Sequence, residues 1–194
     1  MYYKNDIDRI LIPDFEIEEK VAEIGKQLRR DYAGGKEPLL MLGALRGSFV
    51  FLADLARACD MPVEIEFISL SSYGGGTESS GNVRLVKDLD QSVEGRDVLI
   101  VEDIVDTGVT LAFLKGLLNA RRPASLRLCA LLDKPSRRKT PMSADYTGFT
   151  VPDEFLVGYG LDYDSKYRNL RDICVITCSK GDIARSLSAS RKSP

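Results

Sequence analysis

The sequence alternates short apolar runs with segments whose apolar residues recur at helical spacing, and this alternation limits the folds available to it. The apolar runs, which have the length of buried strands, are 38–45, 63–70, 98–101 and 125–133. Helical stripes are expected at 17–32, from Phe49 onward and at about 110–122. Strands that alternate with helices predict an α/β fold: a doubly wound, mostly parallel sheet flanked by helices, with ligands at the carboxyl ends of its strands.

The remaining segments complete this prediction. Further strands are expected at 83–86, 154–160 and 173–178. Ser48 is expected to cap the helix that follows it. The stretch 71–82 has the most flexible composition in the chain, and residues from about 184 to 194 are expected to form a disordered tail. No repeat and no second domain is recognisable, so the 194 residues predict one domain.

The composition argues against several partners. The chain carries a formal net charge of −2 and has no basic half, which argues against bulk affinity for nucleic acid. No apolar run approaches the roughly 20 residues that span a bilayer, and the start "MYYKNDIDRI" lacks the apolar core of a signal peptide. We therefore expect no nucleic-acid partner, no membrane association and a cytoplasmic location.

Histidine is absent from the sequence, which excludes Ser-His-Asp and Cys-His catalysis and most zinc sites. The four cysteines lie at 59, 129, 174 and 178, and buried free thiols are the better interpretation than a disulfide framework. Catalytic chemistry in this chain must therefore rest on carboxylates, Lys, Arg, Tyr, backbone amides or a hard metal ion.

One stretch, "VLIVEDIVDTGVTL" from Val98 to Leu111, combines hydrogen-bond donors and acids at a strand end. Its turn, Thr107–Thr110, joins a strand to a helix start, so free backbone amides, the helix dipole and two threonine hydroxyls can hold a phosphate. Glu102, Asp103 and Asp106 crowd the same place. Carboxylates accept hydrogen bonds from sugar hydroxyls, and Mg²⁺ can bridge carboxylate to phosphate. The stretch therefore predicts a sugar phosphate as ligand; a capped helix beside solvated acids is the alternative.

The same stretch resembles the 5-phosphoribosyl-1-pyrophosphate (PRPP) motif of type I phosphoribosyltransferases: an apolar strand, two acids, two apolar residues and Asp-Thr-Gly. From about Leu39 to Thr177 the chain is similar to the hypoxanthine-guanine phosphoribosyltransferases. The resemblance implies the type I phosphoribosyltransferase fold, as one domain over 1–194, with a small hood from the terminal segments. It also implies transfer of phosphoribose from PRPP to hypoxanthine or guanine, which gives IMP or GMP and pyrophosphate in purine salvage, with Mg²⁺ as cofactor.

By this resemblance the PRPP motif has three tasks. Glu102 and Asp103 hold the ribose hydroxyls and serve as metal ligands, and Asp106 lies beside purine nitrogen 7 as the general base. The 5′-phosphate is held by Thr107, Gly108, Val109 and Thr110. Val109 stands where many relatives carry Lys or another longer side chain. Because the family uses the backbone amide at that position, phosphate binding is expected to survive without a side-chain contribution.

The leaving group has its own implied site. "LRGS" at 45–48 resembles the family's pyrophosphate loop, in which the peptide between the first two residues is cis; an ordinary strand-to-helix turn is the alternative. The residues implied to bind pyrophosphate are Leu45, Arg46, Gly47 and Arg168. Ser72 and Tyr73, which precede three glycines, resemble the mobile loop that closes over the active site, and a surface linker is the alternative.

The segment 151–170 resembles the family's base and metal segment. Phe155 is implied to stack on the purine, the Leu156 carbonyl to meet its exocyclic position, and Asp162 to bind Mg²⁺ through water. Lys134, at the end of "CALLDK", resembles the lysine that donates to the purine 6-oxo group. Taken alone, Phe155 would be a core aromatic and Lys134 a solvated strand-end lysine.

Two other functions stay open. A PRPP-responsive regulator would keep the sugar-phosphate site without catalysis, and the presence of Asp106, Lys134 and Phe155 argues against it. A transferase for adenine or a pyrimidine is the second alternative. Lys134 argues against adenine, since an ammonium cannot accept a hydrogen bond from a 6-amino group. The sequence leaves open the preference among hypoxanthine, guanine and xanthine, and the choice between a homodimer and a homotetramer.

Overall fold

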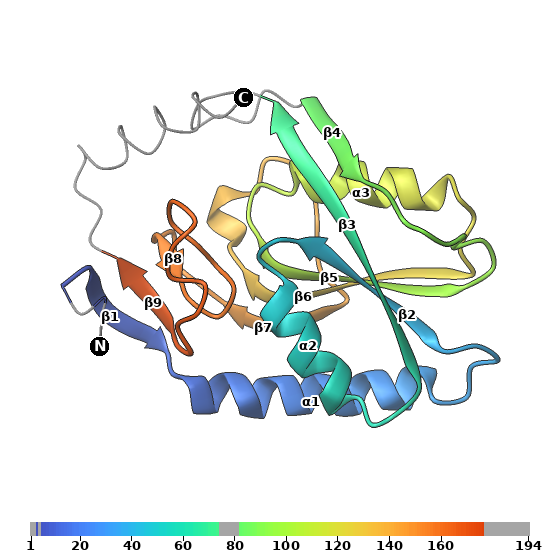
Figure 1. Ribbon diagram of the computed structural model, residues 1–194, viewed down its shortest axis with the longest axis horizontal. Coiled ribbons are helices and arrows are strands. Elements are labelled where there is room, and N and C mark those ends of the chain that lie inside the picture. The colour runs from blue at the N-terminus through green and yellow to red at the C-terminus, as the bar shows by residue number, and fades with distance from the viewer. Residues whose placement is uncertain (1–2, 4, 74–81, 177–194) are drawn as a thin grey trace.

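The computed structural model describes residues 3, 5–73 and 82–176, which form a central six-stranded sheet (Figure 1). Its strands are β2 (Leu39–Leu45), β3 (Val63–Tyr73), β4 (Asn82–Lys87), β5 (Asp97–Val105), β6 (Ser125–Asp133) and β7 (Tyr146–Thr150). The three glycines at 74–76 and the tail expected at about 184–194 lie outside the described residues.

The order of the strands is β4-β3-β2-β5-β6-β7, in which β4 is antiparallel to β3 and all other neighbours are parallel. From β2 the chain continues outward to β3, and from β5 it continues the other way to β6. The connections therefore diverge between β2 and β5, the kind of point at which doubly wound sheets bind ligands. The predicted α/β class, with a doubly wound and mostly parallel sheet, is confirmed.

Helices cover both faces of this sheet (Figure 1). The helices are α1 (Asp14–Tyr32), α2 (Phe49–Ala58) and α3 (Val109–Asn119). Successive strand residues point to opposite faces, so Leu39 and Met41 pack with α1 and α2, whereas Leu40 and Leu42 pack with α3. The sheet is thus buried on both sides, which explains why its strands read as continuous apolar runs. No helix in the described part of the chain is long and apolar enough to cross a membrane.

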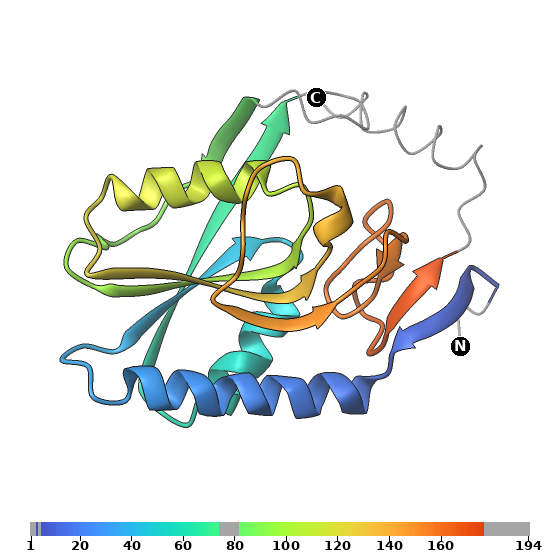
Figure 2. The same cartoon turned by 180° about the vertical axis from the view of Figure 1, so that it is seen from behind.

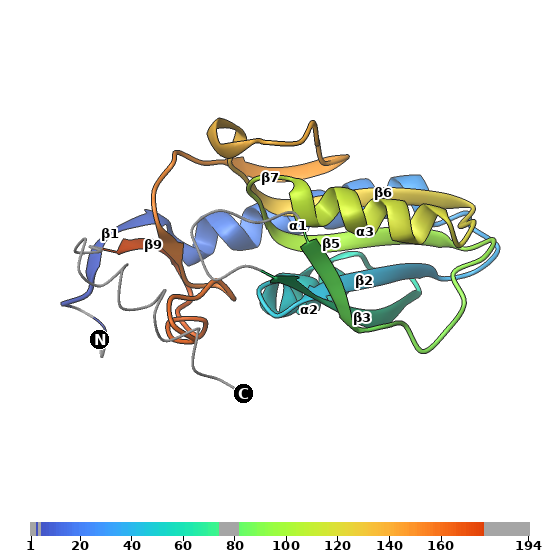
Figure 3. The ribbon, with the colours of Figure 1, turned by 90° about the horizontal axis from the view of Figure 1, so that it is seen from above.

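A second, antiparallel sheet is built by β1 (Ile7–Ile12), β9 (Ile173–Ile176) and β8 (Leu156–Val157), in the order β1-β9-β8. It lies beside one end of the central sheet, and β1 and β9 run side by side although they are far apart in the sequence (Figures 2 and 3). The hood expected from the terminal segments falls in this region. Because β8 is one of its strands, this small sheet also fixes the segment expected to hold the base.

Three local features differ from the prediction. Ser48 does not cap α2 with its side chain, because its Oγ donates to the Ala44 carbonyl at 2.7 Å instead. The strand expected at 154–160 is reduced to β8, because Gly158 and Gly160 adopt φ angles of 99° and 101° and turn the chain. The short strands β1 and β7 were not predicted, since exposed residues interrupt their apolar pattern.

The cysteines that the structure describes are buried free thiols, as predicted: Cys59, Cys129 and Cys174. Burial raises the pKa of both Cys59 and Cys174 to about 11, so these thiols are poor nucleophiles at neutral pH. Cys178 lies outside the described residues.

Candidate active site

The loops that follow β5, β6 and β7 meet at the carboxyl edge of the sheet and line a pocket of about 410 Å³. Its lining residues are Ile104, Asp106, Lys134, Arg137, Asp153, Glu154, Phe155, Leu156, Leu161 and Asp162. Parallel strands end at one edge of a sheet, which is why loops far apart in the sequence converge there. The pocket brings together the expected base residues Asp106, Lys134, Phe155, Leu156 and Asp162.

The turn after β5 has a backbone form suited to anion binding. Gly108 adopts a φ of 80° directly before α3, and a Cβ there would lie 2.8 Å from the Thr140 carbonyl oxygen, so glycine is required twice over. The Val109 N–H donates to Thr107 Oγ1 at 3.4 Å, and Thr110 lies in the first turn of α3. The expected phosphate residues therefore surround a helix amino terminus, where N–H groups without helical partners attract anions.

Glu102 and Asp103 are part-buried acids near the end of β5. The Glu102 Oε2 atom is buried and has no hydrogen-bond partner among the described residues. Burial, together with the Asp103 charge, raises the pKa of Glu102 well above its usual value. Burial also raises the pKa of Asp103 to about 6, although the Ile104 N–H donates to its Oδ1 at 3.0 Å and favours the charged form. A cation or a set of hydroxyl donors would stabilise both carboxylates here.

The loop after β2 packs directly against these acids. The Leu45–Arg46 peptide is cis, as the resemblance implied. Gly47 lies so close to Asp103 that a Cβ on Gly47 would be 1.7 Å from Asp103 Oδ2. A Cβ on Gly160 would be 2.1 Å from the Gly47 carbonyl oxygen. The expected pyrophosphate loop is therefore held between the end of β5 and the turn after β8, and the Arg46 side chain stays exposed.

Lys134 is buried rather than solvated. Its Nζ donates to the Glu154 carbonyl at 2.8 Å and lies 3.9 Å from Asp153 Oδ1. Burial lowers the pKa of Lys134, whereas the nearby charges of Asp106 and Asp153 act in the opposite direction. The ammonium is thus fixed in direction at the wall of the pocket, where it can meet an acceptor on a ligand.

Phe155 presents its ring to the pocket rather than to the core, with 44% of the residue exposed. Its ring lies edge-on to Tyr163 with 5.2 Å between the centroids. The Ile176 N–H donates to the Phe155 carbonyl at 3.2 Å, and Leu156 pairs with Val175 in the small sheet. An aromatic ring held in this way offers a stacking surface for a planar ligand.

Arg168 and Asp162 form an ion pair, with 2.6 Å between Arg168 Nη2 and Asp162 Oδ1. Arg168 Nη1 also donates to the Gly160 carbonyl at 2.6 Å, and the Ser165 N–H donates to Asp162 Oδ2 at 2.8 Å. Both carboxylate oxygens of Asp162 therefore have protein partners. Through Gly160, the pair adjoins the loop at Gly47.

Arg137 and Asp153 line the pocket but were not among the predicted site residues. Arg137 ends η1 (Pro135–Arg137), and its Nε lies 3.2 Å from Asp106 Oδ1. One signal in the sequence could have indicated Arg137. The proline after Lys134 marks a turn, and such a turn brings Arg137, three positions after Lys134, back toward the pocket. Ile104, Glu154 and Leu161 were missed as well.

Ser72 and Tyr73, expected to belong to a mobile loop, end β3, where their backbones pair with Val83 and Asn82 of β4. The glycines that follow them fall outside the described residues.

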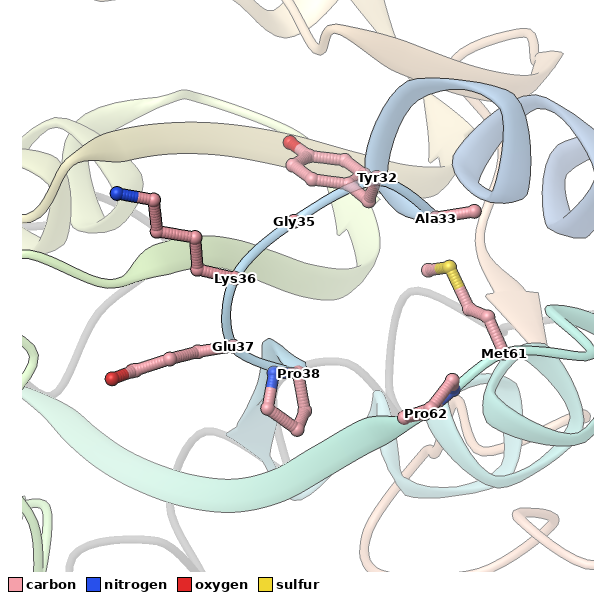
Figure 4. Close-up of a pocket in the computed structure, with 8 residues that line it drawn as sticks. All are labelled: Tyr32, Ala33, Gly35, Lys36, Glu37, Pro38, Met61 and Pro62. Carbon is pink, nitrogen blue, oxygen red and sulfur yellow. The ribbon is translucent and has the colours of Figure 1, made fainter.

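Figure 4 shows another hollow, of about 180 Å³, where α1 ends and where β2 and β3 begin. Its lining residues are Tyr32, Ala33, Gly35, Lys36, Glu37, Pro38, Met61 and Pro62. The side chains of Lys36 and Glu37 extend away from Met61 and Pro62. This hollow lies at the edge of the sheet opposite the carboxyl ends and contains none of the predicted site residues. The pocket beyond β5, which brings together five of the predicted site residues, is the candidate active site.

A helix-start turn suited to anion binding, two neighbouring acids and a pocket, all at the carboxyl edge of this sheet, define a class, and sequence comparison identifies it. The family described as "Phosphoribosyl transferase domain" matches residues 14–164, and the chain belongs to this family.

Within the family, the chain is similar to proteins that act on hypoxanthine and guanine. It is 49% identical over 173 residues to the hypoxanthine-guanine phosphoribosyltransferase of Bacillus subtilis. The aligned region covers 89% of this chain and 95% of that protein. It is also 49% identical over 172 residues to the bifunctional protein TilS/HprT of Listeria innocua, of which it spans 26%.

Solved structures give the same result. A hypoxanthine phosphoribosyltransferase from Staphylococcus aureus superimposes with a TM-score of 0.87 and 46% identity, over 91% of this chain and 95% of that chain. The Trypanosoma cruzi enzyme in complex with the product IMP superimposes with a TM-score of 0.82 and 47% identity, over 88% of this chain and 95% of that one.

Proposed function

We propose that the protein transfers 5-phosphoribose from PRPP to a 6-oxopurine, hypoxanthine or guanine or both, and releases pyrophosphate and IMP or GMP. The observation that carries the proposal is the position of Asp106 and Lys134 on one pocket beside the exposed ring of Phe155. One residue can accept a proton, one can donate to an oxo group, and one can stack on a purine. The similarity to named hypoxanthine and hypoxanthine-guanine phosphoribosyltransferases supports the same activity.

In this proposal PRPP lies along the loops after β2 and β5. The amides and hydroxyls of Thr107–Thr110 hold the 5′-phosphate at the start of α3, and Glu102 and Asp103 accept hydrogen bonds from the ribose hydroxyls. The amides of 45–47 and the guanidinium of Arg168 receive the negative charge that develops on the departing pyrophosphate. The contact of Gly47 with Asp103 keeps the ribose and pyrophosphate sites at a fixed separation.

The acids in this region fit Mg²⁺. Their donors are carboxylate oxygens, which hard cations prefer, and the buried Glu102 Oε2 has a free acceptor site among the described residues. No group of three or more Asp, Glu, Cys or His side chains that could hold a metal ion by itself occurs in the described part of the chain. Glu102 and Asp103 would therefore share the ion with PRPP and water, and Asp162 would reach it through water. When bound, Mg²⁺ supplies charge neutralisation at the leaving group.

The purine is proposed to stack on Phe155, with its 6-oxo group on Lys134 and its exocyclic position at the Leu156 carbonyl. Asp106 takes the proton of nitrogen 7 while nitrogen 9 bonds to the ribose carbon. The turn after β8 lies against the proposed pyrophosphate loop, so the segments proposed to hold the base and the leaving group adjoin each other. We also propose that the protein is cytoplasmic and that it forms a homodimer or a homotetramer. Size-exclusion chromatography with light scattering would distinguish the two oligomers.

The deciding experiment incubates the purified protein with PRPP, Mg²⁺ and one base at a time: hypoxanthine, guanine, xanthine, adenine or uracil. Nucleotide and pyrophosphate are measured by chromatography. The proposal requires product with hypoxanthine or guanine and little with adenine. PRPP binding without pyrophosphate release in the presence of any base would favour a PRPP-binding regulator, and product only with adenine or uracil would identify a different transferase.

A further inference from the structure

Arg137 lies in the candidate base pocket between two carboxylates. Its Nε is 3.2 Å from Asp106 Oδ1, and its Nη1 is 3.7 Å from Asp153 Oδ1. The three-residue turn η1 attaches it directly behind Lys134 at the end of β6, so backbone geometry sets its position. Arg137 thus contacts the acid that is proposed to accept the proton, without belonging to the PRPP motif.

The contact leaves the carboxylate able to accept. Asp106 Oδ1 is buried and takes no hydrogen bond from the described residues, although the guanidinium lies at ion-pair distance. The main chain of Asp106 is held separately, because Arg138 Nη1 donates to its carbonyl at 3.0 Å. Arg137 therefore restrains the carboxylate by charge at the buried Oδ1, while the Asp106 side chain as a whole is 38% exposed and can meet a ligand in the pocket.

Asp153 gives Arg137 a second acidic neighbour. Asp106 becomes neutral when it takes a proton. If Asp106 were the only anion near Arg137, this step would leave the guanidinium without an anionic partner and would therefore be disfavoured. Asp153, which also lies 3.9 Å from Lys134 Nζ, keeps an anion beside Arg137 throughout. Anionic and cationic side chains alternate along this wall of the pocket, in the order Asp106, Arg137, Asp153 and Lys134.

We propose that Arg137 is a positioning residue for proton transfer to Asp106. The inference rests on the proposed function. In that reaction the covalent bond between purine nitrogen 7 and its hydrogen breaks, and the proton goes to the Asp106 carboxylate. The electron pair stays in the purine ring, from which nitrogen 9 forms its bond to the ribose carbon as the bond to pyrophosphate breaks. Arg137 holds the Asp106 carboxylate in position for the first of these events.

The test is a double-mutant cycle built from Arg137→Met and Asp106→Asn. Arg137→Met should lower kcat roughly tenfold, a fraction of the effect of a general base itself, and leave KM for PRPP within about twofold. Arg137→Lys keeps a cation and should recover kcat to within about threefold of wild type. In the Asp106→Asn protein, Arg137→Met should change kcat less than about twofold, because a residue that acts through Asp106 has nothing left to position.

Lys139 provides the matched control, because it is an exposed cation on the same loop with no ion pair to Asp106 or Asp153 among the described residues. Lys139→Gln should keep wild-type kcat. The proposal is overturned if Arg137→Met lowers kcat equally with and without Asp106, if it has no effect, or if Arg137→Lys is as poor as Arg137→Met. Arg137→Gln replaces Arg137→Met if the latter loses the native circular dichroism spectrum.

Failure of the underlying function is visible separately. A wild-type protein that forms no nucleotide, or an Asp106→Asn protein with full activity, refutes the proposed reaction or the role of Asp106 before any Arg137 variant is measured. Either result also removes the role assigned to Arg137.

Discussion

Asp103 occupies the space that a side chain at position 47 would need: a Cβ on Gly47 would lie 1.7 Å from Asp103 Oδ2. The two residues come from different loops, after β2 and at the end of β5, and each belongs to a different proposed half of the PRPP site. Their contact sets how far the pyrophosphate loop stands from the ribose acids. A glycine is needed there for the close approach itself.

Gly47→Ala should therefore move either the loop or the carboxylate. We expect kcat/KM for PRPP to fall on the order of 10²-fold, since a displacement near 1 Å at a reacting centre has effects of that size. Gly116→Ala is the matched control, because a Cβ on this α3 residue meets nothing within 4 Å. It should keep activity and gain about 0.5–1 kcal/mol of stability. A Gly47→Ala protein within about threefold of wild type would contradict the close contact.

Asp106→Asn tests the proposed general base. Turnover should fall roughly 10²–10⁴-fold, whereas PRPP affinity should change little, because the amide keeps the shape of the carboxylate but accepts no proton. Asp164→Asn, on the exposed turn that carries Ser165, should leave both quantities near wild type. Steady-state kinetics and PRPP titration by calorimetry separate the two effects. If Asp106→Asn stays within about threefold in turnover, Asp106 has no part in the chemistry.

Metal removal should abolish activity without unfolding the protein. EDTA is expected to stop product formation and Mg²⁺ to restore it, because Glu102 and Asp103 offer only hard oxygen donors. The melting temperature without PRPP should not change, since no three-ligand group exists in the described residues to hold an ion before substrate binds. Activity that persists in EDTA, or a melting temperature that drops, would disagree with an ion held jointly with substrate.

Lys134→Gln should narrow base selectivity. The Lys134 ammonium can pair with a 6-oxo oxygen but not with a 6-amino group, whereas glutamine offers both a donor and an acceptor. The kcat/KM with hypoxanthine and with guanine should fall, and the ratio of these values to the kcat/KM with adenine should become smaller. The measured quantity is kcat/KM for the three bases at saturating PRPP and Mg²⁺. An unchanged hypoxanthine-to-adenine ratio would place selectivity elsewhere.

Lys134 should also make stability depend on pH in the alkaline range. Burial lowers its pKa below the usual 10.5, so the folded state binds fewer protons than the unfolded state between the folded pKa and 10.5. Stability from this group therefore rises with pH through that window. Relative to wild type, Lys134→Met should be most favoured near pH 7 and lose part of that advantage by pH 10. Denaturant titrations of both proteins at the two pH values measure the difference; a pH-independent difference would argue against burial of the charge.

Much of the fold could be predicted from the sequence, because the central strands are buried on both faces and therefore appear as continuous apolar runs. β2, β5 and β6 were recognised for this reason. β1 and β7 lie at sheet edges with exposed residues, and their identity as strands depends on partners far away in the sequence. Gly158 and Gly160 follow β8 and turn the chain. Two glycines in a sequence do not by themselves show that the strand before them is only two residues long.

The candidate site divides in the same way. Asp106 and Lys134 each follow a recognisable strand, so a parallel sheet predicts that both lie at its carboxyl edge, and the family resemblance implied that they share a base site. Arg137 escaped notice because its place depends on how η1 folds back toward Asp106, which no periodicity records. The hydroxyl of Ser48 was misassigned because capping preference says nothing of the competing carbonyl at Ala44.

The pairing of β1 with β9 has a consequence for the order in which the molecule can be completed. β8, which carries the proposed base-binding segment into the small sheet, pairs with β9, and β9 pairs with β1. On a ribosome, residues 39–150 can assemble the central sheet while the chain is still being made. The wall beside Phe155 must wait until Ile176 has left the exit tunnel. The candidate pocket is therefore completed last, and a nascent chain halted before β9 would contain the proposed phosphate-binding turn without the strand that fixes the proposed base-binding segment.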